Sequence, residues 1–176
     1  MTREQLEHLI RAASVIAADD SIVVIGSQAI LGQFPDAPAP LRASVEADLF
    51  PLHHPERADL IDGSIGELSP FHETFGYYAQ GVDETTARLP AGWKERLVVI
   101  DNENTGGARG LCLEIHDLLV AKVIAGREKD LSFLAEAARH RMANAGVLAD
   151  RLSTVSGIDE TVRAVARRRI GSAFAP

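Results

Sequence analysis

The sequence predicts an α+β protein, in which an N-terminal half of mixed strands and helices precedes a C-terminal half made of helices. Short apolar runs bounded by turn residues, such as residues 21–25 and 97–100, indicate strands in the first half. After His116 the apolar residues recur at helical spacing only. We therefore expect an α+β core over residues 1–116 and a helical region over residues 117–176 that packs on that core.

Local signals order the first half. Thr2 and Gln5 have the spacing of a capping box before a helix, and the continuous apolar run 21–25 is typical of a strand covered on both faces. Gly26 permits a sharp turn after this strand. The expected elements are helices over 3–18, 27–33 and 55–61, a helical turn from Ser69 to Gly76, strands over 21–25, 44–50, 77–83, 97–100 and 110–115, and loops over 34–41 and 101–107. Residues 85–89 are expected as a hairpin partner of the strand 77–83, and Asp62-Gly63 as the end of the helix 55–61.

The second half reads as four helices. Their expected ranges are 117–125, 129–143, 147–154 and 158–171, with Asp159 near the start of the last. Gly126 breaks the first from the second. No internal repeat or low-complexity tract separates the two halves.

Composition excludes several classes of protein. The net charge of −7 argues against broad, non-specific binding of nucleic acid, which requires a basic surface. A single cysteine, Cys112, forms no internal disulfide and fits a reducing compartment. No apolar run reaches the roughly 18 residues of a membrane span, and the first residues lack the apolar centre of a signal peptide. We expect a cytoplasmic protein without a membrane partner.

Glu46 and Asp48 are the first candidate site residues. They stand two residues apart in the predicted strand 44–50, so their side chains point to the same face of the sheet. Two carboxylates on one face are unfavourable unless something neutralises them, and such oxygens suit Mg²⁺ together with substrate phosphates. The alternative is an exposed sheet edge or an ion pair with Arg42.

Gly26 and Ser27 are the second pair of candidate site residues. Gly26 allows a ligand to approach the backbone closely, and Ser27 can hydrogen-bond a phosphate at a helix start. The alternative is a helix cap that binds no ligand. His53 and His54 lack the further close ligands of a zinc site, and we interpret them as loop residues.

These two motifs together resemble the nucleotidyltransferase superfamily of the DNA polymerase beta type. Its minimal members have an apolar strand, Gly-Gly or Gly-Ser, a helix, and then Asp-x-Asp in the next strand. Many bacterial members read Arg-x-Thr-x-Asp-x-Asp-Leu, which Arg42-Ala-Ser44-Val-Glu46-Ala-Asp48-Leu49 matches with Ser for Thr and Glu for the first Asp. The resemblance implies a mixed or antiparallel sheet with flanking helices and a helical C-terminal subdomain.

A second part of the resemblance lies in the helical half. Asp117-Leu-Leu-Val-Ala-Lys122, followed by Arg127-Glu-Lys-Asp130, is similar to a helix pair in family members of unknown function and in toxin-type relatives. The resemblance implies that Lys122 contacts a triphosphate; the alternative is a lysine whose ammonium reaches the helix edge. Asp130 is expected to support Lys122 or Arg127, or to lie at the start of the next helix.

Superfamily enzymes commonly use a third carboxylate from a later strand. Asp83, at the end of the strand 77–83, is the first candidate here, and Glu114, placed in the strand 110–115, is the second. Glu46 is one methylene longer than the usual Asp, which affects the geometry of a metal site.

The resemblance implies a Mg²⁺-dependent nucleotidyltransferase that moves a nucleoside monophosphate from a nucleoside triphosphate to an acceptor. Glu46, Asp48 and Asp83 would bind the metal, and Gly26, Ser27, Arg42, Ser44 and Lys122 would bind the nucleotide. The acceptor could be tRNA, a protein or a small molecule. The alternative is a degraded nucleotidyltransferase fold that acts as a partner-binding module, for instance in a toxin–antitoxin pair.

Overall fold

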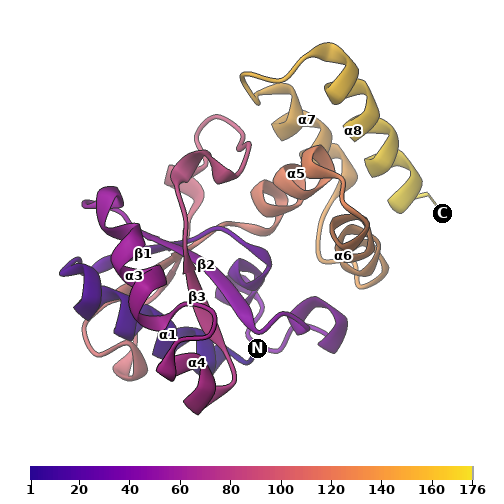
Figure 1. The fold of residues 1–176 in the computed structure, drawn as a ribbon. Helices are drawn as coiled ribbons and strands as arrows, with labels where there is room; N and C mark the ends of the chain where they lie inside the picture. Colours follow the sequence, from indigo (N-terminus) through magenta and orange to yellow (C-terminus); the bar gives the residue numbers. More distant parts are fainter. Residues whose placement is uncertain (176) are drawn as a thin grey trace. The chain divides into compact units, whose positions relative to one another are not determined.

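A computed structural model of the chain describes residues 1–175 and divides into two compact units (Figure 1). The first unit comprises Met1–Thr86 and Leu97–Leu113. The second unit comprises Ala87–Arg96 and the chain from Glu114 onward. The segment Ala87–Arg96, which the sequence placed with the α+β core, thus belongs to the helical unit.

The first unit is built on a five-stranded mixed sheet in the order β3-β2-β1-β5-β4, which confirms the predicted fold class. The strands are β1 (Ser21–Val24), β2 (Glu46–Pro51), β3 (Tyr78–Gly81), β4 (Val98–Ile100) and β5 (Arg109–Cys112). Strand β1 pairs with β2 antiparallel and with β5 parallel; β3 is parallel to β2, and β4 is antiparallel to β5. Every residue of β1 is buried, as its continuous apolar run predicts for a central strand.

Four helices belong to the first unit: α1 (Arg3–Ala17), α2 (Ile30–Gln33), α3 (Ala58–Ile65) and α4 (Pro70–Phe75). The capping box at the start of α1 is present, with the Thr2 side chain accepting from the Gln5 backbone N–H. Helix α1 contacts β1, β2, β3 and β5, and α3 contacts β2 and β3. A short 3₁₀ turn, Ser27–Ala29, precedes α2, so Gly-Ser leads into one tight turn rather than a long helix.

Helix α3 fixes which face of the sheet is covered at β2 and β3. A Cβ atom at Gly81 would lie 2.0 Å from the Ala58 carbonyl oxygen in α3, so only glycine lets the strand and helix approach this closely. Gly81 pairs with Leu49, and both Leu49 and Ala47 are fully buried. The side chains that alternate with these residues therefore point to the opposite face.

Three local predictions were wrong. Helix α3 continues through Asp62 and Gly63 to Ile65, because burial of Ile61 and Ile65 outweighs the low helix propensity of an exposed glycine. Residues 85–89 form no hairpin strand: Glu84–Thr86 is a 3₁₀ turn, and β3 pairs with β2 instead. Glu114 lies outside a strand; β5 ends at Cys112 and Glu114 caps the next helix.

The second unit contains α5 (Ile115–Ala125), α6 (Glu128–Arg139), α7 (Ala145–Ser153) and α8 (Glu160–Ala173), close to the four predicted helices. Helix α5 contacts each of the other three (Figure 1), which explains why it is apolar on nearly all sides. The segment Ala87–Arg96 joins this unit through an isolated bridge between Pro90 and Val155. Within residues 1–175, no helix is both long and apolar enough to cross a bilayer.

Candidate active site

The two carboxylates of β2 share one face of the sheet, as the sequence predicted. Glu46 and Asp48 are partly exposed, whereas Ala47 and Leu49 between and beside them are fully buried. This alternation turns both acids away from the face that α3 covers. In the described residues 1–175, no ion pair joins Arg42 to Glu46, because the Arg42 Nε–H donates to the Ala37 carbonyl oxygen.

The bend after β1 lies directly against Asp48. A Cβ atom at Gly26 would lie 1.6 Å from Asp48 Oδ2 and 2.6 Å from its carboxyl carbon, an impossible overlap. The backbone supports the same approach, since the Ile25 N–H donates to the Asp48 carbonyl oxygen at 3.1 Å. Gly26 is thus required for the Asp48 carboxylate to occupy its position beside the bend.

Ser44 sets the start of β2. Its hydroxyl accepts from the Glu46 N–H at 3.1 Å and is within 3.2 Å of the Glu46 carbonyl oxygen, to which it donates. These bonds hold the backbone of Glu46 in the position from which its side chain leaves the sheet. The structure therefore brings Gly26, Ser44, Glu46 and Asp48 together in the first unit, with Ser27 next to Gly26.

Tyr78 adds a hydroxyl that sequence reasoning missed. It pairs with Glu46 across the parallel β2–β3 ladder, and its Oη donates to Glu46 Oε2 at 3.4 Å. Burial raises the pKa of the Tyr78 phenol, and the charges of Glu46, Glu67 and Asp48 raise it further. The phenol therefore stays protonated and acts as a donor among acids.

Gln28 is the second group that the sequence did not single out. It lies in the 3₁₀ turn after Gly26, is fully buried, and its Nε2 and Oε1 have no hydrogen-bond partner within residues 1–175. A buried polar group without partners costs roughly 1–3 kcal/mol. Such a cost in the turn beside the carboxylates is typical of a site that gives up stability for function.

The two predicted third carboxylates lie on the turn after β3 and at the start of α5. Asp83 follows β3 on an exposed turn, where it accepts from the Thr85 N–H at 2.7 Å, and hydrogen bonds from the side chain and then the backbone of Thr85 lower the pKa of Asp83. On β3 itself, Tyr78 and Gln80 stand opposite Glu46 and Asp48. Strand β3 thus presents a phenol and an amide where the resemblance implies an acid.

Lys122 belongs to a buried ion cluster of the second unit. Its Nζ lies 3.1 Å from Asp130 Oδ1 and 4.5 Å from the centre of the Phe133 ring. Arg127 Nε donates to the other oxygen of Asp130 at 2.7 Å. Burial lowers the pKa of Lys122, while the Asp130 charge opposes this shift. Asp130 therefore supports both cations, and Lys122 has a role in the fold of the helical unit whether or not it also meets a phosphate.

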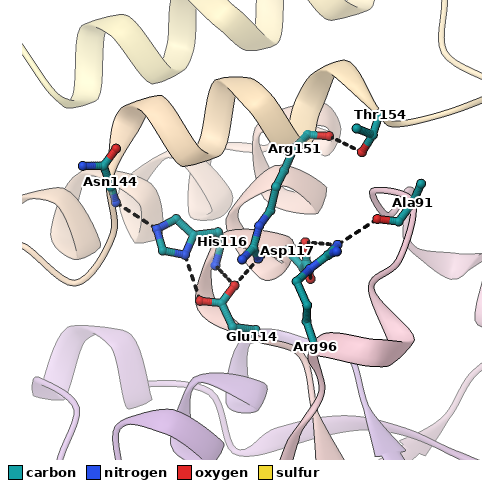
Figure 2. A network of polar contacts seen from close by, with 8 residues as sticks. All are labelled: Ala91, Arg96, Glu114, His116, Asp117, Asn144, Arg151 and Thr154. Atoms are coloured by element: carbon teal, nitrogen blue, oxygen red, sulfur yellow. Dashed lines mark hydrogen bonds and ion pairs between the residues drawn. The ribbon is translucent and has the colours of Figure 1, made fainter.

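The first residue of the Asp117–Lys122 motif is structural as well (Figure 2). Asp117 is fully buried and accepts from Arg96 Nε at 2.8 Å and Nη2 at 3.0 Å, with Arg151 Nη1 at 3.1 Å. Because Arg96 lies in the segment Ala87–Arg96, its two bonds fasten that segment to α5, and Arg151 joins α7 to the same carboxylate.

Glu114 completes this network as the N-cap of α5 (Figure 2). Its carboxylate accepts from the His116 backbone N–H at 3.0 Å and from His116 Nδ1 at 2.8 Å, and it pairs with Arg151. The Asn144 N–H donates to His116 Nε2, which leaves Nδ1 as the protonated nitrogen. Burial alone would raise the pKa of Glu114, but these bonds lower it to about 2.

A different set of metal-ligating side chains lies at the end of α1. Asp19, Asp20 and His53 have donor atoms within 4.8 Å of one another, beside a cavity of about 550 Å³. Asp19 already accepts from the backbone N–H groups of Ser21, His53 and His54 and from His53 Nδ1. Three of these bonds join the end of α1 to the residues after β2, and the fourth joins it to the start of β1, so a structural role accounts for the bonds of Asp19.

Glu46 and Asp48 fit a hard divalent cation better. They supply oxygen donors on one partly exposed face, and oxygen donors are the ligands that Mg²⁺ prefers. Among residues 1–175, Glu46 and Asp48 belong to no group of three acidic, histidine or cysteine side chains whose donor atoms all lie within 4.8 Å of one another. The remaining ligands would then come from substrate phosphates and water.

A mixed sheet with a Gly-Ser bend after its central strand, and two carboxylates on the antiparallel neighbour, defines a nucleotidyltransferase-like protein. Sequence comparison gives the particular group. Residues 4–166 match the family described as "Nucleotidyltransferase of unknown function (DUF6036)", and the chain belongs to this family. The match confirms the resemblance drawn from the motifs. No curated protein and no solved structure matches the chain.

The Gly26–Asp48 contact predicts the effect of a single methyl group. In Gly26→Ala the added Cβ displaces the Asp48 carboxylate, which can swing aside because it is the end of a side chain. We expect the fold to persist and Mn²⁺ or Mg²⁺ binding to fall by about tenfold or more, measured by calorimetry. Gly63→Ala, on the exposed face of α3, is the control and should bind as the native protein does. Unchanged binding by Gly26→Ala would contradict the role of the bend.

The buried amide of Gln28 leads to a prediction about the stability of the fold. Gln28→Met removes two unpartnered polar atoms at similar volume, so the free energy of unfolding should rise by about 1 kcal/mol. Thermal unfolding followed by circular dichroism measures this change. A lower unfolding temperature would mean that the amide is satisfied by ordered water in solution.

The lowered pKa of Glu114 predicts acid sensitivity of the helical unit. The carboxylate of Glu114 contributes stability that is complete above its unfolded pKa of 4.5 and is lost as the pH falls toward about 2. Glu114→Gln should therefore be less stable than the native chain at neutral pH, and this difference should shrink on acidification. Urea unfolding across this pH range measures it; a difference independent of pH would refute the assignment.

Proposed function

We propose that the first unit is the core of a Mg²⁺-dependent nucleotidyltransferase that moves a nucleoside monophosphate from a nucleoside triphosphate to an acceptor. The observation that carries the proposal is the contact between the Gly26 bend and the Asp48 carboxylate, with Glu46 on the same face. An open backbone bend and oxygen ligands at one place suit a triphosphate that arrives with a divalent cation.

Each residue has a defined part in this proposal. Glu46 and Asp48 hold the cation, which when bound supplies the positive charge that the triphosphate and the leaving pyrophosphate require. Gly26 leaves room for the Asp48 carboxylate, and the Ser27 hydroxyl orients the phosphates. Ser44 fixes the backbone from which Glu46 projects, while Arg42 is bonded to the Ala37 carbonyl oxygen. The acceptor hydroxyl or phosphate approaches the same face.

The parts of Asp83 and Lys122 in the proposal differ. An exposed Asp83 is held by its own turn and would have to leave Thr85 to reach a metal. The Lys122 ammonium lies in the second unit, where it is hydrogen-bonded to Asp130. We therefore assign the essential metal contacts to Glu46 and Asp48 alone.

One observation favours a second candidate function. Strand β3 carries Tyr78 and Gln80 opposite the acids, and Glu46 replaces the usual Asp. A fold that has lost its third carboxylate can serve as a partner-binding module, for example in a toxin–antitoxin pair. Such a module would keep the sheet and the helical unit without binding a nucleotide.

Nucleotide titration separates these functions. We expect at least one of MgATP, MgGTP, MgCTP and MgUTP to bind the native chain at millimolar concentration or below, measured by calorimetry. Asp48→Asn should abolish this binding and leave the unfolding temperature nearly unchanged, because one of two repelling carboxylates is neutralised. Asp101→Asn, an exposed Asp on the turn after β4, is the matched control.

Two results would count against the enzyme. Absence of binding by all four nucleotides would favour the module. Magnesium-dependent binding that survives in Asp48→Asn would remove the proposed metal ligand.

A further inference from the structure

We propose that Tyr78 is a positioning residue: its hydroxyl holds the Glu46 carboxylate in the orientation that binds the divalent cation. The inference deepens the proposed function and rests on it. It assigns to β3 a hydrogen-bond donor in the place where the resemblance implies a third acid.

The register of the sheet places the two side chains together. Strands β2 and β3 are parallel, and Glu46 and Tyr78 are directly paired, so both leave the same face at adjacent positions. The phenol Oη lies 3.4 Å from Glu46 Oε2. Among residues 1–175 this is the side-chain hydrogen bond that Glu46 makes, so the phenol is the protein group that restrains its carboxylate.

The phenol is itself held from the other side. The His72 ring packs on the Tyr78 ring with centroids 4.6 Å apart and planes inclined by 47°. His72 is fixed in turn, because its Nδ1 accepts from the Leu68 N–H at 3.1 Å and its backbone N–H donates to Ser69 Oγ at 3.2 Å. The Tyr78 ring is therefore held in place by His72. A ring that is held in place can orient another group through its hydroxyl.

Glu46 has a specific need for such a restraint. Glutamate has one more rotatable bond than aspartate, so its carboxylate samples more positions and loses more entropy when a metal fixes it. The hydrogen bond from the Tyr78 hydroxyl to one oxygen of Glu46 reduces the freedom of the carboxylate. The other oxygen stays available for the cation. A donor, unlike a third carboxylate, achieves this without adding negative charge beside Glu46, Asp48 and Glu67.

Tyr77 provides a matched control one residue away. Its hydroxyl is hydrogen-bonded to His8 Nδ1 at 2.7 Å, and its ring is part of an aromatic cluster with Phe71 and Phe75. Tyr77→Phe and Tyr78→Phe thus each remove one hydroxyl from a partly or fully buried ring. Only the second removes a contact with Glu46.

The test measures Mn²⁺ affinity by the electron paramagnetic resonance signal of the free ion. Tyr78→Phe should weaken Mn²⁺ binding by about tenfold or more, as loss of an outer-shell partner does, whereas Tyr77→Phe should bind as the native chain does. In a Glu46→Gln background, Tyr78→Phe should cause no further loss, because the group that it positions is already changed. Circular dichroism melting of each variant confirms that the fold is kept.

The outcomes separate this inference from the proposed function. If Mn²⁺ binds and Asp48→Asn abolishes binding, but Tyr78→Phe has native affinity, the positioning role is refuted and the metal site stands. The positioning role is also refuted if Tyr78→Phe and Glu46→Gln lower the Mn²⁺ affinity independently, so that their effects add in the double variant. A tyrosine that only supports the fold would give this additive result. If the native chain binds no Mn²⁺, the proposed function and the inference both fail.

Discussion

The close approach of the Gly26 backbone to the Asp48 carboxylate is the constraint on which the candidate site depends. It joins the end of a buried central strand to the exposed face of its antiparallel neighbour, and it needs three conditions at once. Strand β1 must end before Gly26, β2 must keep a register that places Asp48 opposite the bend, and α3 must cover the other face. The apolar core thus turns two acids outward to one place. The energy of burial in β1 and β2 holds charges together that would otherwise separate.

The sequence was sufficient for this part of the fold because the signals were local. An i, i+2 pair of acids in a strand shares a face regardless of what lies beside the strand. Gly26 and Asp48, only about twenty residues apart, are joined by a strand–turn–helix unit that has few arrangements. The capping box of α1 and the glycines Gly76 and Gly126, both with positive φ, were predictable for the same reason.

The parts that the sequence could not supply depend on register between distant segments. Tyr78 lies in a predicted strand, but its pairing with Glu46 depends on β3 being parallel to β2, which local patterns do not encode. The prediction of a hairpin strand at residues 85–89 was wrong for the same reason, because it depended on which strand pairs with β3. Gln28 carries no sequence signal because its significance comes from burial without partners, and burial is a property of the whole unit.

The charged residues of the helical unit show why a motif match does not by itself assign chemistry. Asp117, Lys122 and Asp130 all belong to the recognised pattern, and each is engaged in a buried ion pair. Removing one partner of such a pair leaves a buried charge and is strongly destabilising, so fold stability alone can explain these residue types at that spacing. Glu46 and Asp48 differ because they lie on one partly exposed face of β2, beside the bend at Gly26. A ligand can reach carboxylates on such a face, and it is on this ground that we propose the site on β2 rather than on the helices.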